Sequence, residues 1–384
     1  MKPSFCAIAN QQTGEDLIGT AGHYQTYVLI ECPRPWAAKV FTSEKIPANL
    51  RDYVKSIKAQ RSIQFLAISR GDIAATESVT VMVYERTLPS DVALSKQGSA
   101  SRESIHTYRG YEFQLDSLSQ VVGCLEAHWQ GDRIGQPITQ KDILICTHGM
   151  RDKCCARFGH TFFREAARSV KQGRLPSNTR IWKVSHIGGH RFAPTAISLP
   201  DGRYYGRLTI EALEAIMTRS GSVNQLSAVY RGWGLLPSPL QVLERQLILT
   251  WGWSWFDCTV NYQILTDSML TTNRQARSET SPNETLSDET PQKKRLHEIS
   301  VEISVVLTDT SQATYRTMLV QDPDKTVYTK ASCNSAVPVP ITKYTVTECT
   351  QVKSQAADIR AADTPVPLAV SAKTSSKASS PATS

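Results

Sequence analysis

The stretch from Cys146 to His190 constrains the fold more than any other part of this 384-residue chain. It holds three of the nine cysteines and four of the eight histidines. They gather in two short segments, which read CTHGMRDKCCARFG from Cys146 and HIGGHRFAPT from His186. Thiolates and imidazoles are the ligands that zinc and iron–sulfur centres use. The chain is therefore expected to fold so that these two segments meet.

Four of these residues have a spacing that suits one shared metal centre. Cys146 and Cys155 are nine residues apart, one at a predicted strand end and the other at a predicted helix start. His186 and His190 are four residues apart, and the two glycines between them allow a tight turn. Two sulfur and two nitrogen ligands suit either a tetrahedral Zn²⁺ or a [2Fe–2S] cluster with split ligation.

The other cysteines and histidines have simpler interpretations. Cys154 could replace Cys155 as the ligand, or the adjacent pair could serve a thiol–disulfide oxidoreductase. His148 forms half of a Rieske-like motif with Cys146, but the second half is missing, so we interpret it as a structural residue or one that supports the metal ligands. His160 is expected to be a surface or packing residue. The remaining cysteines are interpreted as ordinary buried or surface thiols: Cys6, Cys32, Cys124, Cys258, Cys333 and Cys349.

The order of the predicted elements divides the chain into four parts: an α/β lobe (1–133), a second α/β lobe (134–256), a β appendage (257–350) and a tail (351–384). The second lobe reads strand, helix, strand, hairpin, helix, which is the order of a thioredoxin-like unit. A polar segment, 271–295, predicts a disordered insertion in the appendage, and the low complexity of the tail predicts disorder there too. The sequence shows no internal repeat.

The element boundaries follow from hydrophobic periodicity and turn residues. Strands are expected at 24–32, 62–69, 78–84, 111–118, 141–146, 179–185, 195–199 and 204–208. Helices are expected at 46–60, 155–171, 209–218 and 237–250. The appendage is expected to contain short strands at 257–265, 298–307, 314–320, 326–329 and 341–347. Residues 1–22 and 90–104 are expected to be irregular.

The positive charge of the chain lies in the part that holds the Cys/His segments. Residues 1–133 carry 14 basic and 14 acidic side chains, whereas residues 134–265 carry 16 basic and 8 acidic ones. This asymmetry favours a docking face for an acidic redox partner, such as a small ferredoxin or a reductase. A solvated surface around an anionic centre is the simpler alternative. Nucleic acid is disfavoured, since no Lys/Arg run interleaved with aromatic residues is present.

Cysteine usage and hydropathy indicate the compartment. The N-terminus has no apolar core of a signal peptide, and the most apolar late stretch, Leu247–Phe256, has half the length that crosses a bilayer. An odd number of cysteines without framework spacing argues for free thiols and metal ligands. We therefore expect a soluble, cytoplasmic protein with no membrane contact. Its oligomeric state is left open.

Several separate motifs resemble the sucrase/ferredoxin-like family of thioredoxin-fold [2Fe–2S] ferredoxins. The two Cys/His segments are followed in the family's order by GRYYGRL from Gly202 and YRGWGLLPSPLQVLE from Tyr230. The GTA at Gly19 and the ECPRPW ending at Trp36 resemble the family's opening. The resemblance runs from about residue 5 to about residue 250, so the appendage and tail lie outside it.

The resemblance implies a [2Fe–2S] cluster with Cys146, Cys155, His186 and His190 as ligands, and it favours Cys155 over Cys154. It implies one-electron transfer or redox sensing, and an electron carrier more than a stand-alone enzyme. The word sucrase implies glycosidase activity, which nothing in the sequence supports. A structural zinc module and a thiol oxidoreductase remain the alternatives.

Split ligation has consequences for the redox potential. Two thiolates and two neutral imidazoles leave an oxidised cluster without net charge, so it should accept an electron more readily than an all-cysteine cluster. Imidazole ligands that lose a proton should make the potential fall as the pH rises.

Overall fold

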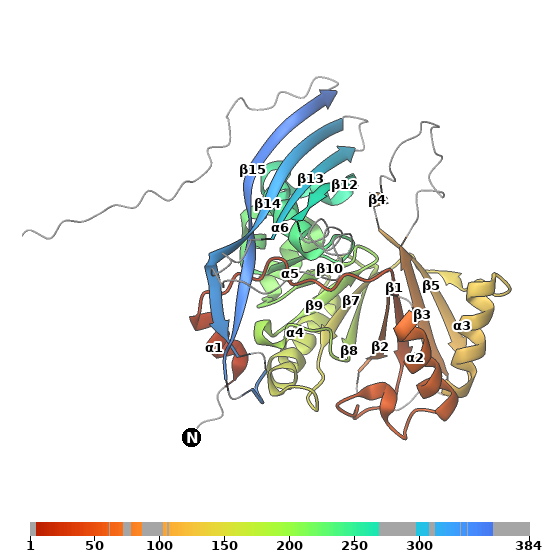
Figure 1. Ribbon diagram of the computed structural model, residues 1–384. Helices are drawn as coiled ribbons and strands as arrows, with labels where there is room; N and C mark the ends of the chain where they lie inside the picture. Colours follow the sequence, from red (N-terminus) through yellow and green to blue (C-terminus); the bar gives the residue numbers. More distant parts are fainter. Residues whose placement is uncertain are drawn as a thin grey trace, which may run out of the picture.

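The computed structural model describes residues 5–60, 62–71, 78–86, 103–105, 107–268, 297–306, 312–330, 332–335 and 337–355. The predicted insertion at 271–295 lies outside these residues, as does the predicted tail after residue 355. The described part contains one ten-stranded mixed sheet and a separate five-stranded antiparallel sheet (Figure 1). The predicted α/β class and the small β appendage are therefore confirmed. No helix in this part is long and apolar enough to cross a membrane.

The first lobe is built on four central strands and two helices: β1 (Thr26–Glu31), α2 (Ala48–Gln60), β2 (Ile63–Ser69), β3 (Val79–Arg86), β5 (Tyr108–Leu115) and α3 (Val121–Gln130). β1 pairs in parallel with β2 across the α2 crossover and antiparallel with β3, which pairs antiparallel with β5. The strand order is therefore β2-β1-β3-β5. A short helix, α1 (Cys6–Gln12), precedes these elements in a segment that was expected to be irregular.

The sequence analysis missed α3. Its first residues, Val121 and Val122, are β-branched and Gly123 follows them, so its intrinsic helix propensity is low. Burial decides the outcome instead, because Val121, Cys124 and Leu125 pack into the core of the first lobe together with residues of α2.

The second lobe repeats the topology of the first. Its elements are β7 (Lys141–Cys146), the π-helical turn η4 (Cys155–Gly159), α4 (His160–Lys171), β8 (Thr179–Val184), β9 (Ala196–Leu199), β10 (Arg203–Tyr205) and α5 (Ile210–Thr218). β7 pairs in parallel with β8 and antiparallel with β9, which pairs antiparallel with β10. The order β8-β7-β9-β10 is the same as in the first lobe. The structure thus contains a repeat that the sequence does not show.

The two lobes join through their equivalent second strands. β2 and β8 pair antiparallel at Ile68↔Val184 and Ser69↔Lys183, which makes one sheet run through both lobes. β6 (Gln136–Pro137) and β11 (Tyr230–Trp233) form the two edges. α6 (Ser238–Trp251) packs into a core that also takes in the second lobe and the appendage.

The appendage is more continuous than predicted. Its strands are β12 (Thr259–Asp267), β13 (Glu298–Val306), β14 (Gln312–Thr329), β15 (Val339–Gln355) and β4 (Glu103–Ile105). β14 is one strand with a register shift between Asp322 and Val327, where two strands were expected. β15 continues to Gln355, so the expectation of a tail from residue 351 is wrong by five residues. β4 pairs with β12 although its segment was expected to be a loop.

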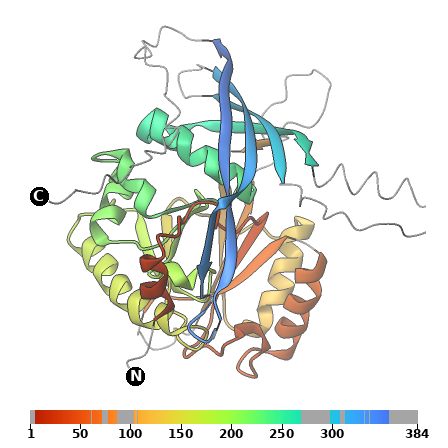
Figure 2. The ribbon, with the colours of Figure 1, turned by 60° about the vertical axis from the view of Figure 1, so that its left-hand side comes forward.

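The β14–β15 hairpin reaches far beyond its sheet. In Figures 1 and 2 it runs from the appendage along the second lobe to α1. Asn10 of α1 donates a hydrogen bond to Thr329 at 3.0 Å, and Lys343 pairs with Glu15 at 3.1 Å. The hairpin therefore brings the turn between its strands to the N-terminal end of the chain.

Candidate metal centre

The carboxyl ends of two neighbouring parallel strands bring the predicted ligands together. Cys146 is the last residue of β7 and lies opposite Val184 of β8, two residues before His186. Because adjacent parallel strands end at the same edge of a sheet, residues forty positions apart in the sequence meet there.

Gly159 allows the helix start to lie directly on the end of β7. A Cβ atom at this position would lie 1.9 Å from the carbonyl oxygen of Cys146. Only glycine permits such an approach. The close contact holds η4 against the strand and places Cys155, its first residue, beside Cys146.

The four predicted ligands form a continuous row. Cys146, Cys155 and His186 make a tight group whose donor atoms all lie within 4.8 Å of one another. Cys155 Sγ is 3.8 Å from His186 Nδ1. His190 Nδ1 lies 3.5 Å from His186 Nε2, so His190 borders the group on the far side of the His186 ring. The structure thus brings all four together, three of them in one tight group.

The turn between the two histidines depends on its glycines and on a buried arginine. Gly188 and Gly189 have φ values of 78° and 71°, in the left-handed region. Arg231 donates a hydrogen bond to the carbonyl oxygen of Gly188 at 3.2 Å, and a Cβ on Gly189 would lie 2.5 Å from its guanidinium carbon. Burial lowers the pKa of Arg231 to about 10. The spacing of residues in the sequence does not predict that Arg231 lies behind this turn.

The two thiols of the tight group differ in their electrostatics. A hydrogen bond from Cys155 lowers the pKa of Cys146, and the same interaction raises the pKa of Cys155. Both cysteines are buried, whereas His186 and His190 are half-buried. The sulfur atoms are therefore shielded from solvent, and the imidazoles form the accessible side of the site.

His148 holds the backbone of the loop that carries the predicted ligands His186 and His190, which we call the ligand loop. Its Nδ1 accepts a hydrogen bond from the N–H of His186 at 3.2 Å, and its Nε2 donates to the carbonyl oxygen of Ala37 at 2.9 Å. Its ring packs edge-on against Trp36. Burial lowers its pKa, which favours the neutral ring. These contacts give His148 a structural role, and they tie the ligand loop to the ECPRPW segment.

Cys154 lies outside the tight group. Its Sγ contacts Cys6, 3.5 Å away, and Cys333, 3.3 Å away. Long-range folding, which no local pattern encodes, therefore groups Cys6 and Cys333, which the sequence analysis interpreted as ordinary separate thiols, with Cys154. His160 on α4 lies near Arg34, outside both groups.

Asp152 is a site residue that the sequence analysis did not single out. Its carboxylate is buried and lies 3.8 Å from His190 Nε2. Burial opposes ionisation, but hydrogen bonds from the backbone N–H groups of Cys333 and Cys154 lower its pKa. The only available signal was its place between the two cysteines of the CTHGMRDKCC segment.

A cavity of about 800 Å³ opens beside the site, between the two lobes. His186 and His148 line it on one side. Its charged lining residues are Lys39, Arg51, Asp52, Lys55 and Arg151. The cavity is therefore mainly basic and reaches the accessible imidazole of the candidate centre.

The fold and these side chains define a mixed α/β protein with a Cys/His group able to hold a metal ion. The chain belongs to the sucrase/ferredoxin-like family, whose model matches residues 17–232, more than half of the chain. The family membership inferred from the sequence motifs is thereby confirmed. Cys6 and the appendage strands β12 to β15 lie outside the matched residues.

Curated relatives match shorter parts of the chain. The protein named Altered inheritance of mitochondria protein 32 from Meyerozyma guilliermondii is 32% identical over 85 residues, which is 21% of this chain and 30% of the relative. Its namesake from Debaryomyces hansenii is 29% identical over 113 residues, or 27% of this chain and 41% of the relative. The chain thus spans less than half the length of these relatives. No solved structure matches it.

Proposed function

We propose that this protein binds a [2Fe–2S] cluster through Cys146, Cys155, His186 and His190, and that it carries single electrons or senses redox state. The observation that carries the proposal is the meeting of two thiols and two imidazoles at one sheet edge, in a member of the sucrase/ferredoxin-like family. When bound, such a cluster supplies one-electron chemistry.

The arrangement of the donors supports a centre with two metal ions. A single tetrahedral ion needs all four donors in one coordination sphere. His190 instead lies beyond the ring of His186, outside the tight group. A binuclear cluster divides its ligands between two irons, as Rieske centres do, and therefore suits a row of ligands.

The surroundings support electron exchange at the imidazole side. The buried thiols are covered by protein, and His186 faces the basic cavity. We propose that an acidic redox protein, of the ferredoxin or reductase type, docks over this cavity. Lys39, Lys55 and Arg151 would attract its negative surface and steer its approach.

A structural zinc site is the second candidate, and the tight group of Cys146, Cys155 and His186 favours it. The thiol oxidoreductase alternative has less support, because Cys154 and Cys155 belong to different groups of side chains.

Spectroscopy and metal analysis of the full chain, purified without oxygen, test the proposal. We expect a coloured protein with about two iron atoms per chain and an electron paramagnetic resonance signal after reduction. Cys146→Ser should lose the iron, whereas Cys124→Ser, which alters a buried thiol in the first lobe, should keep it. A colourless protein with stoichiometric zinc at Cys146 and no iron would favour the second candidate.

The compartment is a further part of the proposal. We retain the cytoplasm on the basis of cysteine usage. The relatives are named for the inheritance of mitochondria. Fractionation of cells that express the tagged chain therefore has to compare cytosol with mitochondria, and recovery in the mitochondrial fraction alone would contradict the cytoplasmic assignment.

A further inference from the structure

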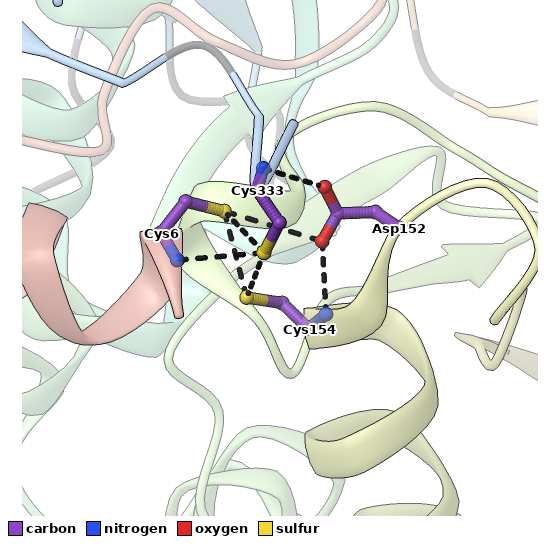
Figure 3. A group of neighbouring side chains, drawn as sticks. All are labelled: Cys6, Asp152, Cys154 and Cys333. Carbon is purple, nitrogen blue, oxygen red and sulfur yellow. Dashed lines mark hydrogen bonds between the residues drawn. The ribbon is translucent and has the colours of Figure 1, made fainter. Parts of the chain in front are cut away.

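We infer that Cys6, Cys154, Cys333 and Asp152 form a second metal site, which takes Zn²⁺. Figure 3 shows the four side chains converging from three separate segments of the chain. Their donor atoms all lie within 4.8 Å of one another. The site shares no donor atom with the Cys146 group, so the inference stands whether or not that group holds iron.

The three sulfur atoms form a nearly equilateral triangle. The Sγ–Sγ distances are 3.5 Å for Cys6–Cys154, 3.3 Å for Cys154–Cys333 and 3.5 Å for Cys6–Cys333. A disulfide would bring two sulfurs to about 2.05 Å and leave the third apart. Sulfur ligands of a tetrahedral zinc lie about 3.8 Å from one another, given Zn–S bonds of about 2.3 Å. The triangle therefore resembles one face of a zinc tetrahedron.

Asp152 supplies the fourth donor. Its Oδ1 lies 4.0 Å from Cys6 Sγ and accepts a hydrogen bond from the N–H of Cys154 at 2.8 Å. Its Oδ2 accepts from the N–H of Cys333 at 3.0 Å. Each carboxylate oxygen has a second lone pair, so these bonds leave capacity for a metal. Hydrogen bonds of this kind orient carboxylate ligands at metal sites.

The environment favours thiolates and a soft cation. The backbone N–H of Ala7 donates to Cys154 Sγ at 3.4 Å, and that of Cys6 donates to Cys333 Sγ at 3.5 Å. Cys6 and Cys154 are buried, and the rings of Phe5 and Phe158 pack edge to face beside them. Three sulfurs and one oxygen suit zinc, whereas calcium and magnesium require mainly oxygen ligands.

A metal here would fasten three distant parts of the chain together. Cys6 begins α1, Cys154 directly precedes η4, and Cys333 lies in the turn between β14 and β15. Cys6 and Cys333 are 327 positions apart. Both lie outside residues 17–232, so the site goes beyond the part matched by the family. The zinc would hold the appendage hairpin against the loop that carries Cys155.

Metal content per chain tests the inference. We expect the full chain, purified without oxygen, to contain one zinc in addition to any iron. Cys6→Ser and Cys333→Ser should each lose the zinc and keep the iron. Cys349→Ser alters another half-buried thiol of the appendage and should keep both. Cys146→Ser should do the reverse, losing iron and keeping zinc. Loss of the proposed zinc site and loss of the proposed cluster site can therefore be told apart by which metal is missing.

If the chain is purified without zinc, titration with cobalt tests the same site. Added to the reduced protein, Co²⁺ should give thiolate-to-metal absorption that saturates at one ion in Cys146→Ser and disappears in Cys146→Ser combined with Cys333→Ser. Equal zinc or cobalt binding in Cys333→Ser and Cys349→Ser would overturn the inference. So would a non-reducing mass spectrum showing that two of the three thiols are joined in a disulfide in the purified protein.

Discussion

Cys154 and Cys155 are adjacent in the sequence, but their sulfur atoms belong to two different groups of candidate ligands. Cys155 Sγ lies 3.8 Å from His186 Nδ1, whereas Cys154 Sγ lies 3.5 Å from Cys6 Sγ. Successive residues in a helical turn point about 100° apart, so one helix start can serve two sites. Asp152, two residues before Cys154, belongs to the second group, and its carboxylate also lies 3.8 Å from His190 Nε2, beside the first. The two candidate centres therefore share one loop.

Gly159→Ala should separate Cys155 from Cys146. The new methyl group would overlap the carbonyl oxygen of Cys146 and push η4 away from β7. We expect the free energy of unfolding to fall by about 3 kcal/mol or more, together with a loss of iron. Gly123→Ala is the control, because nothing lies within 4 Å of the position that a Cβ atom would take there in α3. Its free energy of unfolding should rise by up to about 1 kcal/mol, since alanine favours a helix more than glycine does. Denaturant titration and iron analysis compare the two, and equal stability would refute the packing argument.

His190→Cys should keep the cluster and change its potential. A thiolate in place of a neutral imidazole adds negative charge, so we expect the potential to fall by on the order of 100 mV. Its dependence on pH should weaken because one titratable ligand is gone. Redox titration from mildly acid to alkaline pH measures both effects. A variant whose potential and pH profile match the original protein would exclude His190 as a ligand.

Glu15→Gln should destabilise the protein in a pH-dependent way. The carboxylate is buried and accepts two hydrogen bonds of 2.8 Å from Arg191, and Lys343 lies 3.1 Å away. Burial acts to raise the pKa of Glu15, but these partners outweigh burial and lower the pKa below its ordinary value. A pKa that is lower in the folded state gives stability that is complete above the unfolded-state value and is lost as the pH falls through the folded-state value.

At pH 7 we therefore expect Glu15→Gln to reduce the free energy of unfolding by about 3–5 kcal/mol. The difference in free energy of unfolding between the original protein and the variant should narrow below about pH 4.5, where the carboxyl group of the unfolded chain becomes protonated. Glu126→Gln, at an exposed position of α3, should cost little at any pH. Urea unfolding at several pH values makes the comparison, and a difference that stays constant down to pH 3 would contradict the assignment.

Reversal of charge at the cavity should slow electron transfer from an acidic partner. Lys39 and Arg151 are exposed and line the basic cavity beside His186. We expect Lys39→Glu combined with Arg151→Glu to reduce the second-order rate with an acidic ferredoxin roughly tenfold at low salt, and less at high salt. Arg168→Glu combined with Lys171→Glu, both exposed on α4, changes the net charge equally and is the control. Stopped-flow measurements give the second-order rate of reduction for the cavity variant and for the control. Equal rates for the two would argue against docking at this cavity.

Local signals in the sequence predicted the elements that carry the candidate centre. The strand 141–146 and the strand that ends near His186 were placed within one residue, because each is a short apolar run bounded by turn residues. The helix predicted at 155–171 is present, but its first turn is π-helical, which no propensity scale foretells. Gly159, the last residue of this turn, lies directly on the end of β7, where a Cβ atom would meet the carbonyl oxygen of Cys146.

The sequence by itself determined the family, the α/β class and the residue types that could bind a metal, since motifs, periodicity and side-chain chemistry are all local properties. Tertiary structure alone decided that the two lobes repeat one topology and pair through β2 and β8. It also decided that Cys6 and Cys333 meet Cys154. Contacts across hundreds of residues depend on the packing of the whole chain, and for that reason cysteines that look scattered in the sequence lie together in the fold.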